Sequence, residues 1–199
     1  MKKLMILALV ACLSASVANA SLITAIDYRG ADDDPGAYMK TNLQNADLAY
    51  HDRPTHELEE IPAYLLGAEW VQTANDDRDN DFYELDITLS EPATLYLWID
   101  NRVGNDDDSD PPLIGLANPN VMLWVECLGW TDTGDDMGID EGGDDIINQR
   151  YSIFTKDVDA GLTTLYAQNF SGKNMYGVGA VPEPATVALL GFGALSLIR

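Results

Sequence analysis

Cysteine is scarce in this chain, because its 199 residues include only Cys12 and Cys127. Cys12 lies in an apolar N-terminal segment that is predicted below to be removed, which would leave Cys127 without a partner. A single thiol excludes an intramolecular disulfide, so the free energy of folding must come from the core. Cys127 belongs to the apolar run 121–128, which predicts a buried cysteine acting as a small hydrophobic residue.

Basic residues are also few: 11 Lys and Arg stand against 33 Asp and Glu, for a formal net charge of −22. Such a surface repels the phosphates of nucleic acids and of anionic lipids, so nucleic acid is excluded as a partner. The charge suits solubility in salty surroundings, divalent cations or a cationic partner. A solvated acidic surface with no specific ligand is the simplest explanation.

Catalysis has little support in this sequence. His51 and His56 are the only histidines, and a metal site that combines them with Asp52 is a minor alternative. The sequence contains no Gly-x-Ser-x-Gly, His-Glu-x-x-His or phosphate-loop motif. Because acids are so frequent, the presence of carboxylate pairs says nothing about glycoside hydrolysis. We therefore predict that the protein is not an enzyme.

The N-terminal segment has the three parts of a secretory signal peptide. Lysines at residues 2–3 precede the apolar run 4–13, and Ala18 and Ala20 form an Ala-x-Ala cleavage site. Cleavage at this site removes residues 1–20 and makes Ser21 the first residue of the exported chain.

Cys12 offers an alternative processing point. The sequence Leu-Val-Ala-Cys at residues 9–12 is similar to a lipobox, which would make Cys12 the lipidated first residue. The apolar run before Cys12 is very short for that role, and the Ala-x-Ala site has the better spacing. Both alternatives take the protein out of the cytoplasm.

The C-terminal segment 181–199 joins a Pro-Glu-Pro sequence to an uncharged apolar run and a terminal cation. This order resembles the PEP-CTERM sorting signal of exported bacterial proteins, which implies that an exosortase recognises and processes it. The family's signal usually ends in a cluster of Arg or Lys, whereas this chain has a single Arg. The predicted sorting residues are Val181, Pro182, Glu183, Pro184 and Arg199.

The length of the apolar run fits a transient membrane anchor. A helix over residues 185–198 would be about 21 Å long, shorter than the roughly 30 Å core of a bilayer. Arg199 would stay on the cytoplasmic side. The alternative is that the tail forms a last strand or helix of the folded domain, which the Pro-Glu-Pro opening and the charged end disfavour. We expect an exported protein of the cell surface or extracellular matrix.

Residues 21–180 have a suitable length for one domain with a sizeable core. Apolar segments separated by turns rich in Gly, Pro and Asp predict about eight strands and little helix. We expect an all-β fold, a single antiparallel β-sandwich of jelly-roll type, flanked by the signal peptide and a short apolar C-terminal helix. The predicted strands are 23–28, 68–73, 82–89, 93–99, 121–128, 146–154, 162–170 and 175–181.

Other segments of the domain are predicted to be non-strand. Thr55 can cap a short helix that reaches residue 66, and residues 132–145 form an acidic, glycine-rich loop. Segments 61–77, 95–102 and 174–178 are similar to stretches of PEP-CTERM-tailed surface proteins. That resemblance implies a galactose-binding-like sandwich domain, and it assigns no site residues.

An acidic loop before the third predicted strand is the best candidate for a metal site. Its oxygen side chains follow the 1, 3, 5 spacing of a calcium loop, with further acids at the seventh and twelfth positions. The loop lacks the glycine and the final Glu of an EF-hand, and no helix flanks it, so solvated turns are the alternative. The candidate ligands are Asn75, Asp77, Asp79, Asp81 and Asp86.

Carbohydrate is the second candidate ligand. Trp98, Asp100 and Arg102 place an aromatic ring beside hydrogen-bonding groups at the end of a predicted strand. Each of the four Trp residues lies in or beside an apolar strand, so the alternative for Trp98 is a place in the core. The sequence thus predicts a binding module for extracellular polysaccharide with calcium as a candidate cofactor, or a structural matrix component without a discrete ligand.

Calcium binding by the acidic loops would raise the stability of the folded state by mass action. Adding calcium to the purified protein should therefore raise its melting temperature by several degrees, as measured by calorimetry. An unchanged melting temperature would rule out calcium binding by these loops.

Overall fold

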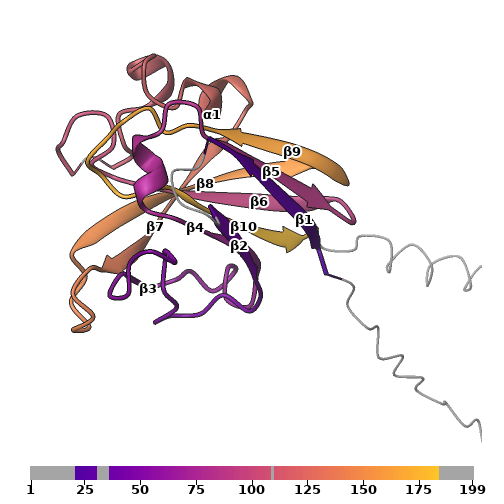
Figure 1. The fold of residues 1–199 in the computed structure, drawn as a ribbon, viewed down its shortest axis with the longest axis horizontal. Helices are drawn as coiled ribbons and strands as arrows, with labels where there is room; N and C mark the ends of the chain where they lie inside the picture. Colours follow the sequence, from indigo (N-terminus) through magenta and orange to yellow (C-terminus); the bar gives the residue numbers. More distant parts are fainter. Residues whose placement is uncertain (1–20, 31–35, 109, 184–199) are drawn as a thin grey trace, which may run out of the picture.

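The computed structural model describes residues 21–30, 36–108 and 110–183. The predicted signal peptide 1–20 and the apolar run of the C-terminal segment lie outside these described residues. Figure 1 shows the described part as a layered β structure with little helix. Within it, no helix is long and apolar enough to cross a membrane.

The described residues form ten strands, one short α-helix and two 3₁₀ turns. Their bounds, in chain order, are β1 Ile23–Arg29, β2 Ala37–Lys40, β3 Glu57–Glu59, β4 Glu69–Thr73, η1 Asp76–Asp79, β5 Glu84–Leu89, β6 Ala93–Asp100, η2 Gly115–Ala117, α1 Leu123–Cys127, β7 Thr131–Asp140, β8 Gln149–Val158, β9 Gly161–Tyr166 and β10 Gly177–Pro182.

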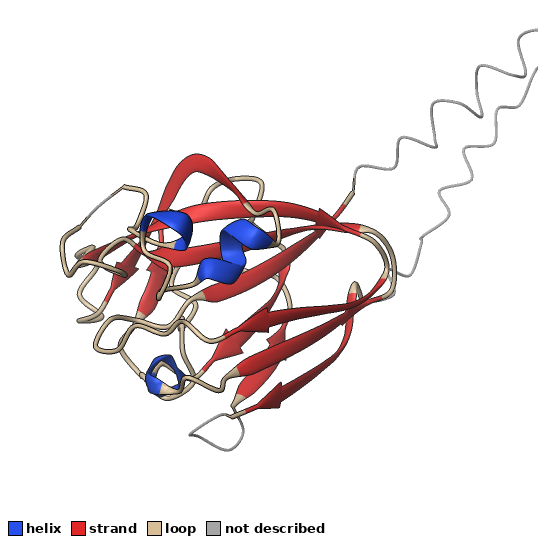
Figure 2. Cartoon of the chain, turned by 90° about the horizontal axis from the view of Figure 1, so that it is seen from above, coloured by secondary structure: helices blue, strands red, loops and turns tan. Residues whose placement is uncertain are grey.

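The strands make two antiparallel sheets, which confirms the predicted β-sandwich. The smaller sheet has the order β1-β5-β9, and the larger one has the order β2-β4-β10-β6-β8-β7-β3. Figure 2 shows the two groups of strands from above, with the helical turns beside them. The hydroxyl of Tyr176, just before β10, donates to the carbonyl of Tyr166 at the end of β9, so the two sheets approach each other there.

Strand β5 follows the predicted alternation of faces. Leu85, Ile87 and Leu89 are buried, whereas Glu84 and Asp86 between them are only partly buried. The charged face is covered by Arg29 of β1, which pairs with both carboxylates. The small sheet therefore buries one face and solvates the other.

Strand β6 is buried on both faces, as its continuous apolar sequence predicts. Leu95, Leu97 and Ile99 are fully buried, and so is Trp98 on the opposite face. The Trp98 side of the large sheet is covered by the long segment that contains β3, since Tyr64 of that segment lies 5.1 Å from Tyr96 between ring centroids.

The centre of the large sheet depends on close contact between β10 and the indole of Trp98. Gly177 pairs with Trp98 across the two strands, and a Cβ atom on Gly177 would lie 2.1 Å from the indole nitrogen. A residue with a side chain at 177 would force the ring out of place. Glycine is required here for space, which explains the Gly-Val-Gly sequence of a central strand.

The predicted strand over 121–128 is wrong: this segment forms the helix α1. Its apolar residues are spaced for a helix, with Val125 buried and Glu126 and Cys127 exposed. Cys127 is therefore a free, exposed thiol rather than a buried residue. Met122, which precedes the helix, has φ 44°, an αL conformation that turns the chain before α1 begins.

Two predicted non-strand segments are also wrong. The acidic segment 132–145 is largely the ten-residue strand β7, whose first half is exposed and whose register shifts between Asp132 and Asp136. The predicted helix over 55–66 is replaced by β3, which pairs with β7, and by turns around Pro62. Pairing with β8 and β3 imposes strand structure on residues whose local sequence favours loops.

Strand β10 passes through the predicted domain boundary after residue 180. Val181 pairs with Thr94 and Pro182 with Ala93 on β6. The backbone N–H of Glu183 then donates to the carbonyl of Pro92. The first residues of the predicted sorting segment are therefore part of the central strand, and no spacer separates them from the folded domain.

The contact between Gly177 and Trp98 makes a specific prediction. Gly177→Ala should destabilise the protein by about 1–3 kcal/mol, because overpacking displaces a fully buried indole. Gly179→Ala is the matched control on the same strand, since its Cβ would lie 3.3 Å from the same ring and the ring needs only a small shift. Urea unfolding measures both, and equal effects would contradict the steric argument.

Candidate functional site

A network of buried polar groups lies where β6 ends. Asp100 is fully buried, and its carboxylate accepts hydrogen bonds from the backbone, Nε and Nη2 of Arg102 at 2.9, 2.9 and 2.5 Å. The backbone N–H of Asn174 also donates to it, at 3.1 Å. A buried carboxylate needs such partners, because an unpaired charge in the interior is strongly destabilising.

Asn174 connects this end of β6 to two other loops. Its side-chain amide donates to Glu141 at 2.8 Å and accepts from Asn75 at 3.1 Å. Asn75 in turn accepts the backbone N–H of Met175 at 2.8 Å. The structure therefore brings together Asn75, predicted as a metal ligand, and the predicted carbohydrate ligands Asp100 and Arg102.

The position of Glu141 is set by a turn that folds around Asp140. Both oxygens of this fully buried side chain accept backbone N–H groups of the next residues, from Gly142 to Asp145, at 2.6–2.8 Å. Glu141 projects from this turn toward Arg102, with an N–O distance of 3.4 Å. The turn is thus held by its own first residue and presents one carboxylate to the network.

The loop before β3 completes the network. Asp52 accepts the backbone N–H groups of Asn75 and Asp76 at 2.7 and 3.1 Å, and Arg53 forms ion pairs with Asp52 and Asp76. His56 lies among these charges, and desolvation by burial lowers its pKa below the ordinary value of 6.5. The neutral form of His56 is therefore the one that fits the folded state.

Two tyrosines close the network on its inner side. The hydroxyls of Tyr50 and Tyr151 are 3.1 Å apart, and Tyr50 donates to the carbonyl of Met175 at 2.6 Å. Burial raises the pKa of both hydroxyls. The main role of the network is to connect loops of the domain to one another, because most of its donors and acceptors are paired with each other.

The five predicted calcium ligands are not gathered at one point. Asn75 and Asp77 are buried, Asp79 accepts the backbone N–H of Gly172, and Asp81 is exposed. Asp86 lies on β5, where hydrogen bonds from Arg29 and Thr164 lower its pKa. Among the residues that the structure describes, no group of three or more His, Cys, Asp or Glu side chains is placed to hold a metal ion.

Trp98 is not a surface platform. Its side chain is 2% exposed and packs against Trp70, with ring centroids 6.4 Å apart. The prediction of Trp98 as a carbohydrate-stacking residue is therefore wrong, because the ring fills the space left by Gly177. Asp100 is likewise fully buried, which leaves Arg102 as the one predicted carbohydrate ligand that reaches the surface, with 21% of its side chain exposed.

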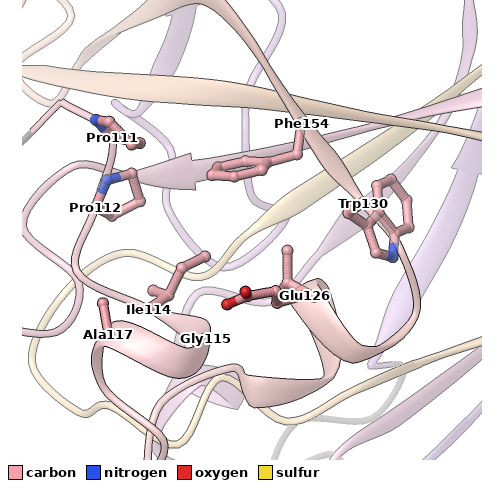
Figure 3. A pocket seen from close by; sticks show the side chains of 9 residues that line it. Pro111, Pro112, Ile114, Gly115, Ala117, Glu126, Trp130 and Phe154 are labelled. Carbon is pink, nitrogen blue, oxygen red and sulfur yellow. The ribbon is translucent and has the colours of Figure 1, made fainter.

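A separate pocket of about 230 Å³ lies between the loop that contains η2, the helix α1 with Trp130 after it, and the strand β8. Figure 3 shows Phe154 and Ile114 facing each other across it, with Trp130 at one side and the Glu126 carboxylate projecting into the space. Most of the lining is apolar. The residues that line it are Pro111, Pro112, Ile114, Gly115, Ala117, Val125, Glu126, Trp130 and Phe154.

The walls of this pocket are held in place by the elements that carry them. One oxygen of Glu126, Oε2, accepts the backbone N–H of Leu116 at 2.7 Å, which ties α1 to η2. Gly115, with φ +65°, passes so close to Glu126 that a Cβ would lie 2.6 Å from that oxygen. Trp130 packs edge to face against Trp124, at 6.4 Å between ring centroids. The pocket is therefore preformed.

Sequence reasoning missed this pocket. Phe154 lies in a predicted strand and Trp130 lies beside one, so the sequence pattern does not distinguish either residue from ordinary core residues. The signals that were present are the Pro111-Pro112 pair and Gly115, which mark a shaped loop after β6. They indicate a turn but not what the turn encloses.

The fold is similar to domains of two glycosidases of known structure. One is a beta-glucuronidase from glycoside hydrolase family 2, with 19% identity, TM-score 0.59, and coverage of 83% of this chain and 15% of that one. The other is a glycoside hydrolase family 138 enzyme targeting pectin rhamnogalacturonan II, with 10% identity, TM-score 0.50, and coverage of 82% and 17%. At these identities the likeness concerns the fold alone, and the chain spans about a sixth of each enzyme.

The C-terminal segment matches the PEP-CTERM protein-sorting motif over residues 180–199. This motif directs the protein to the cell envelope surface or the extracellular space and implies processing by an exosortase. No curated protein matches the chain. The motif begins at Ala180, inside β10.

The lowered pKa of His56 predicts a pH effect on stability. When the pH falls through 6.5, His56 takes up a proton in the unfolded chain but stays neutral in the folded one. Protonation therefore stabilises the unfolded state relative to the folded state, and the free energy of unfolding decreases. The melting temperature should therefore fall between pH 7 and 5, and His56→Gln should reduce this fall. His51→Gln is the control, and equal slopes for the wild type and His56→Gln would contradict the assignment.

Proposed function

We propose that this exported protein is a non-catalytic, carbohydrate-binding component of the cell surface or extracellular matrix. The observation that carries the proposal is the preformed pocket, in which Trp130 and Phe154 form apolar walls beside the carboxylate of Glu126. Aromatic walls and one oriented acceptor are the two features that a sugar requires of its site.

A sugar ring has an apolar C–H face and hydroxyls around its edge. The C–H face packs against aromatic and proline surfaces such as Phe154 and Pro112, and the hydroxyls donate hydrogen bonds to a carboxylate. Glu126 uses Oε2 for Leu116, and within the described residues no donor is bound to its other oxygen. That oxygen is placed to accept from a ligand.

The size of the pocket limits the ligand. Its volume of about 230 Å³ is below the roughly 300–1,000 Å³ of sites that enclose drug-sized molecules. The pocket therefore suits one sugar unit, at a chain end or in a side branch, rather than several consecutive units.

The lining of the pocket supports binding without hydrolysis. Glycosidases in most families use two carboxylates on opposite sides of the scissile bond. Of the residues that line this pocket, Glu126 alone is acidic. A sugar bound here would meet one carboxylate, which can accept a hydrogen bond but lacks the second group that the reaction needs.

The similar solved structures also support carbohydrate as the ligand class. Both are glycoside hydrolases, and the second targets pectin rhamnogalacturonan II. A polysaccharide of the extracellular matrix is the partner that matches an exported chain.

The proposal predicts that the full-length protein binds glycans on an array and that binding depends on the pocket. Glu126→Gln keeps an acceptor for Leu116 but removes the charge, and should weaken binding at least tenfold in titration calorimetry. Ala117→Arg places a long side chain at the exposed rim and should abolish binding.

Phe82→Ala is the matched control, because Phe82 is a large aromatic residue that is 84% exposed and outside the pocket. It should bind glycan like the wild type. Loss of binding in this control, or none in the two pocket variants, would move the site elsewhere. Absence of any glycan ligand would favour the purely structural role.

A further inference from the structure

The carboxylate of Glu69 holds the start of the described chain. It accepts the hydroxyl of Ser21 at 2.8 Å and the backbone N–H groups of Leu22 and Ile23 at 2.8 and 2.7 Å. Three donors from three consecutive residues converge on one side chain. Such a cluster fixes both the position and the direction of the chain at Ser21.

Ser90 holds the same segment from a second side. Its hydroxyl donates to the carbonyl of Ser21 at 3.0 Å, and its backbone N–H donates to the carbonyl of Leu22 at 3.0 Å. Ser21 is thus bound on both its side chain and its carbonyl. Its own backbone nitrogen is three covalent bonds from the hydroxyl oxygen that contacts Glu69.

Glu69 has no cationic partner among the described residues. None of the ion pairs that Lys and Arg side chains form in that part of the chain involves Glu69. Its three donors are neutral, so the negative charge is hydrogen-bonded but not balanced. A cationic partner would add a direct attraction between opposite charges to these hydrogen bonds.

We propose that Glu69 is a docking site for the α-ammonium group of Ser21, which is created when the signal peptide is cleaved after Ala20. Cleavage converts the neutral peptide nitrogen of Ser21 into an ammonium cation. This cation could then pair with Glu69, which has no cationic partner among the described residues. The hydrolysis itself is carried out by the signal peptidase and leaves the Ala20 carboxylate on the released peptide. The proposal needs no ligand in the pocket and is independent of the proposed function.

This ion pair would join the two sheets. Ser21 leads into β1 of the small sheet, whereas Glu69 is the first residue of β4 in the large sheet and pairs there with Ala180 of β10. Figure 1 shows the start of β1 and the end of β10 at the same side of the molecule. The mature N-terminus would therefore be fixed beside the strand that continues into the sorting motif.

The consequence is that processing stabilises the folded domain. Before cleavage the Ser21 nitrogen is an amide, and the two sheets are joined at this point by hydrogen bonds from neutral donors to the Glu69 carboxylate. After cleavage they are joined by a charged pair as well. The exported, processed chain should be more stable than its precursor.

The test compares two chains that differ by one residue, Ser21–Arg199 and Ala20–Arg199. The chain that begins at Ser21 should melt several degrees higher at pH 7. The difference should disappear at pH 10, because an α-amino group titrates near pH 8 and loses its charge. N-terminal sequencing of the exported protein should give Ser21 as the first residue.

Glu69→Gln keeps acceptor capacity for the backbone but removes the charge, and it should abolish the difference between the two chains. Glu91→Gln is the control, because Glu91 is an exposed acid near the same end, and it should leave the difference unchanged. Equal melting temperatures of the two chains, a difference that survives in Glu69→Gln, or an N-terminus other than Ser21 would overturn the proposal.

Discussion

The structure depends on the position of β10, the last strand of the described residues, inside the large sheet. β10 pairs with β4 on one side and β6 on the other, and its glycines leave room for the indole of Trp98. Without this strand, the sheet would be split into two parts and a fully buried tryptophan would lose one wall. The folded domain is therefore completed only by a strand whose last residues belong to the sorting motif, and folding and sorting involve the same strand.

The polar groups of the domain are used in two different ways. The network around Asp100 and Asn174 is buried and largely paired with itself, so it fixes the loops at one end of the large sheet. The pocket between α1 and β8 has the opposite character, with apolar walls and one carboxylate. A self-satisfied network gains little from a ligand, whereas an apolar, preformed hollow gains by excluding water. For this reason the pocket, rather than the network, supports the assignment of carbohydrate binding.

The local sequence pattern was sufficient to predict strands whose buried and exposed residues follow the apolar and polar residues of the sequence. The alternation of β5 and the continuous apolar run of β6 predicted both strands and their buried faces. The same reasoning failed for residues 121–128, because a short apolar run cannot distinguish a buried strand from a helix. It failed for β7 because the first half of that strand is acidic and exposed, and pairing with β8 creates the strand. Trp98 and Trp130 look alike in sequence, and packing alone decides which ring fills the core and which lines a pocket.

The amino-acid sequence by itself determined the class of fold and the route of the protein, because strand periodicity and the order of charges in a sorting signal are local properties. The tertiary structure decided which residues meet. It placed Asn75 beside Asn174, enclosed Trp98, formed the pocket at Glu126 and brought Ser21 to Glu69 across 48 residues of chain. These contacts depend on strand register and on sheet packing, which no short segment encodes, because each requires two distant parts of the chain to be fixed at once.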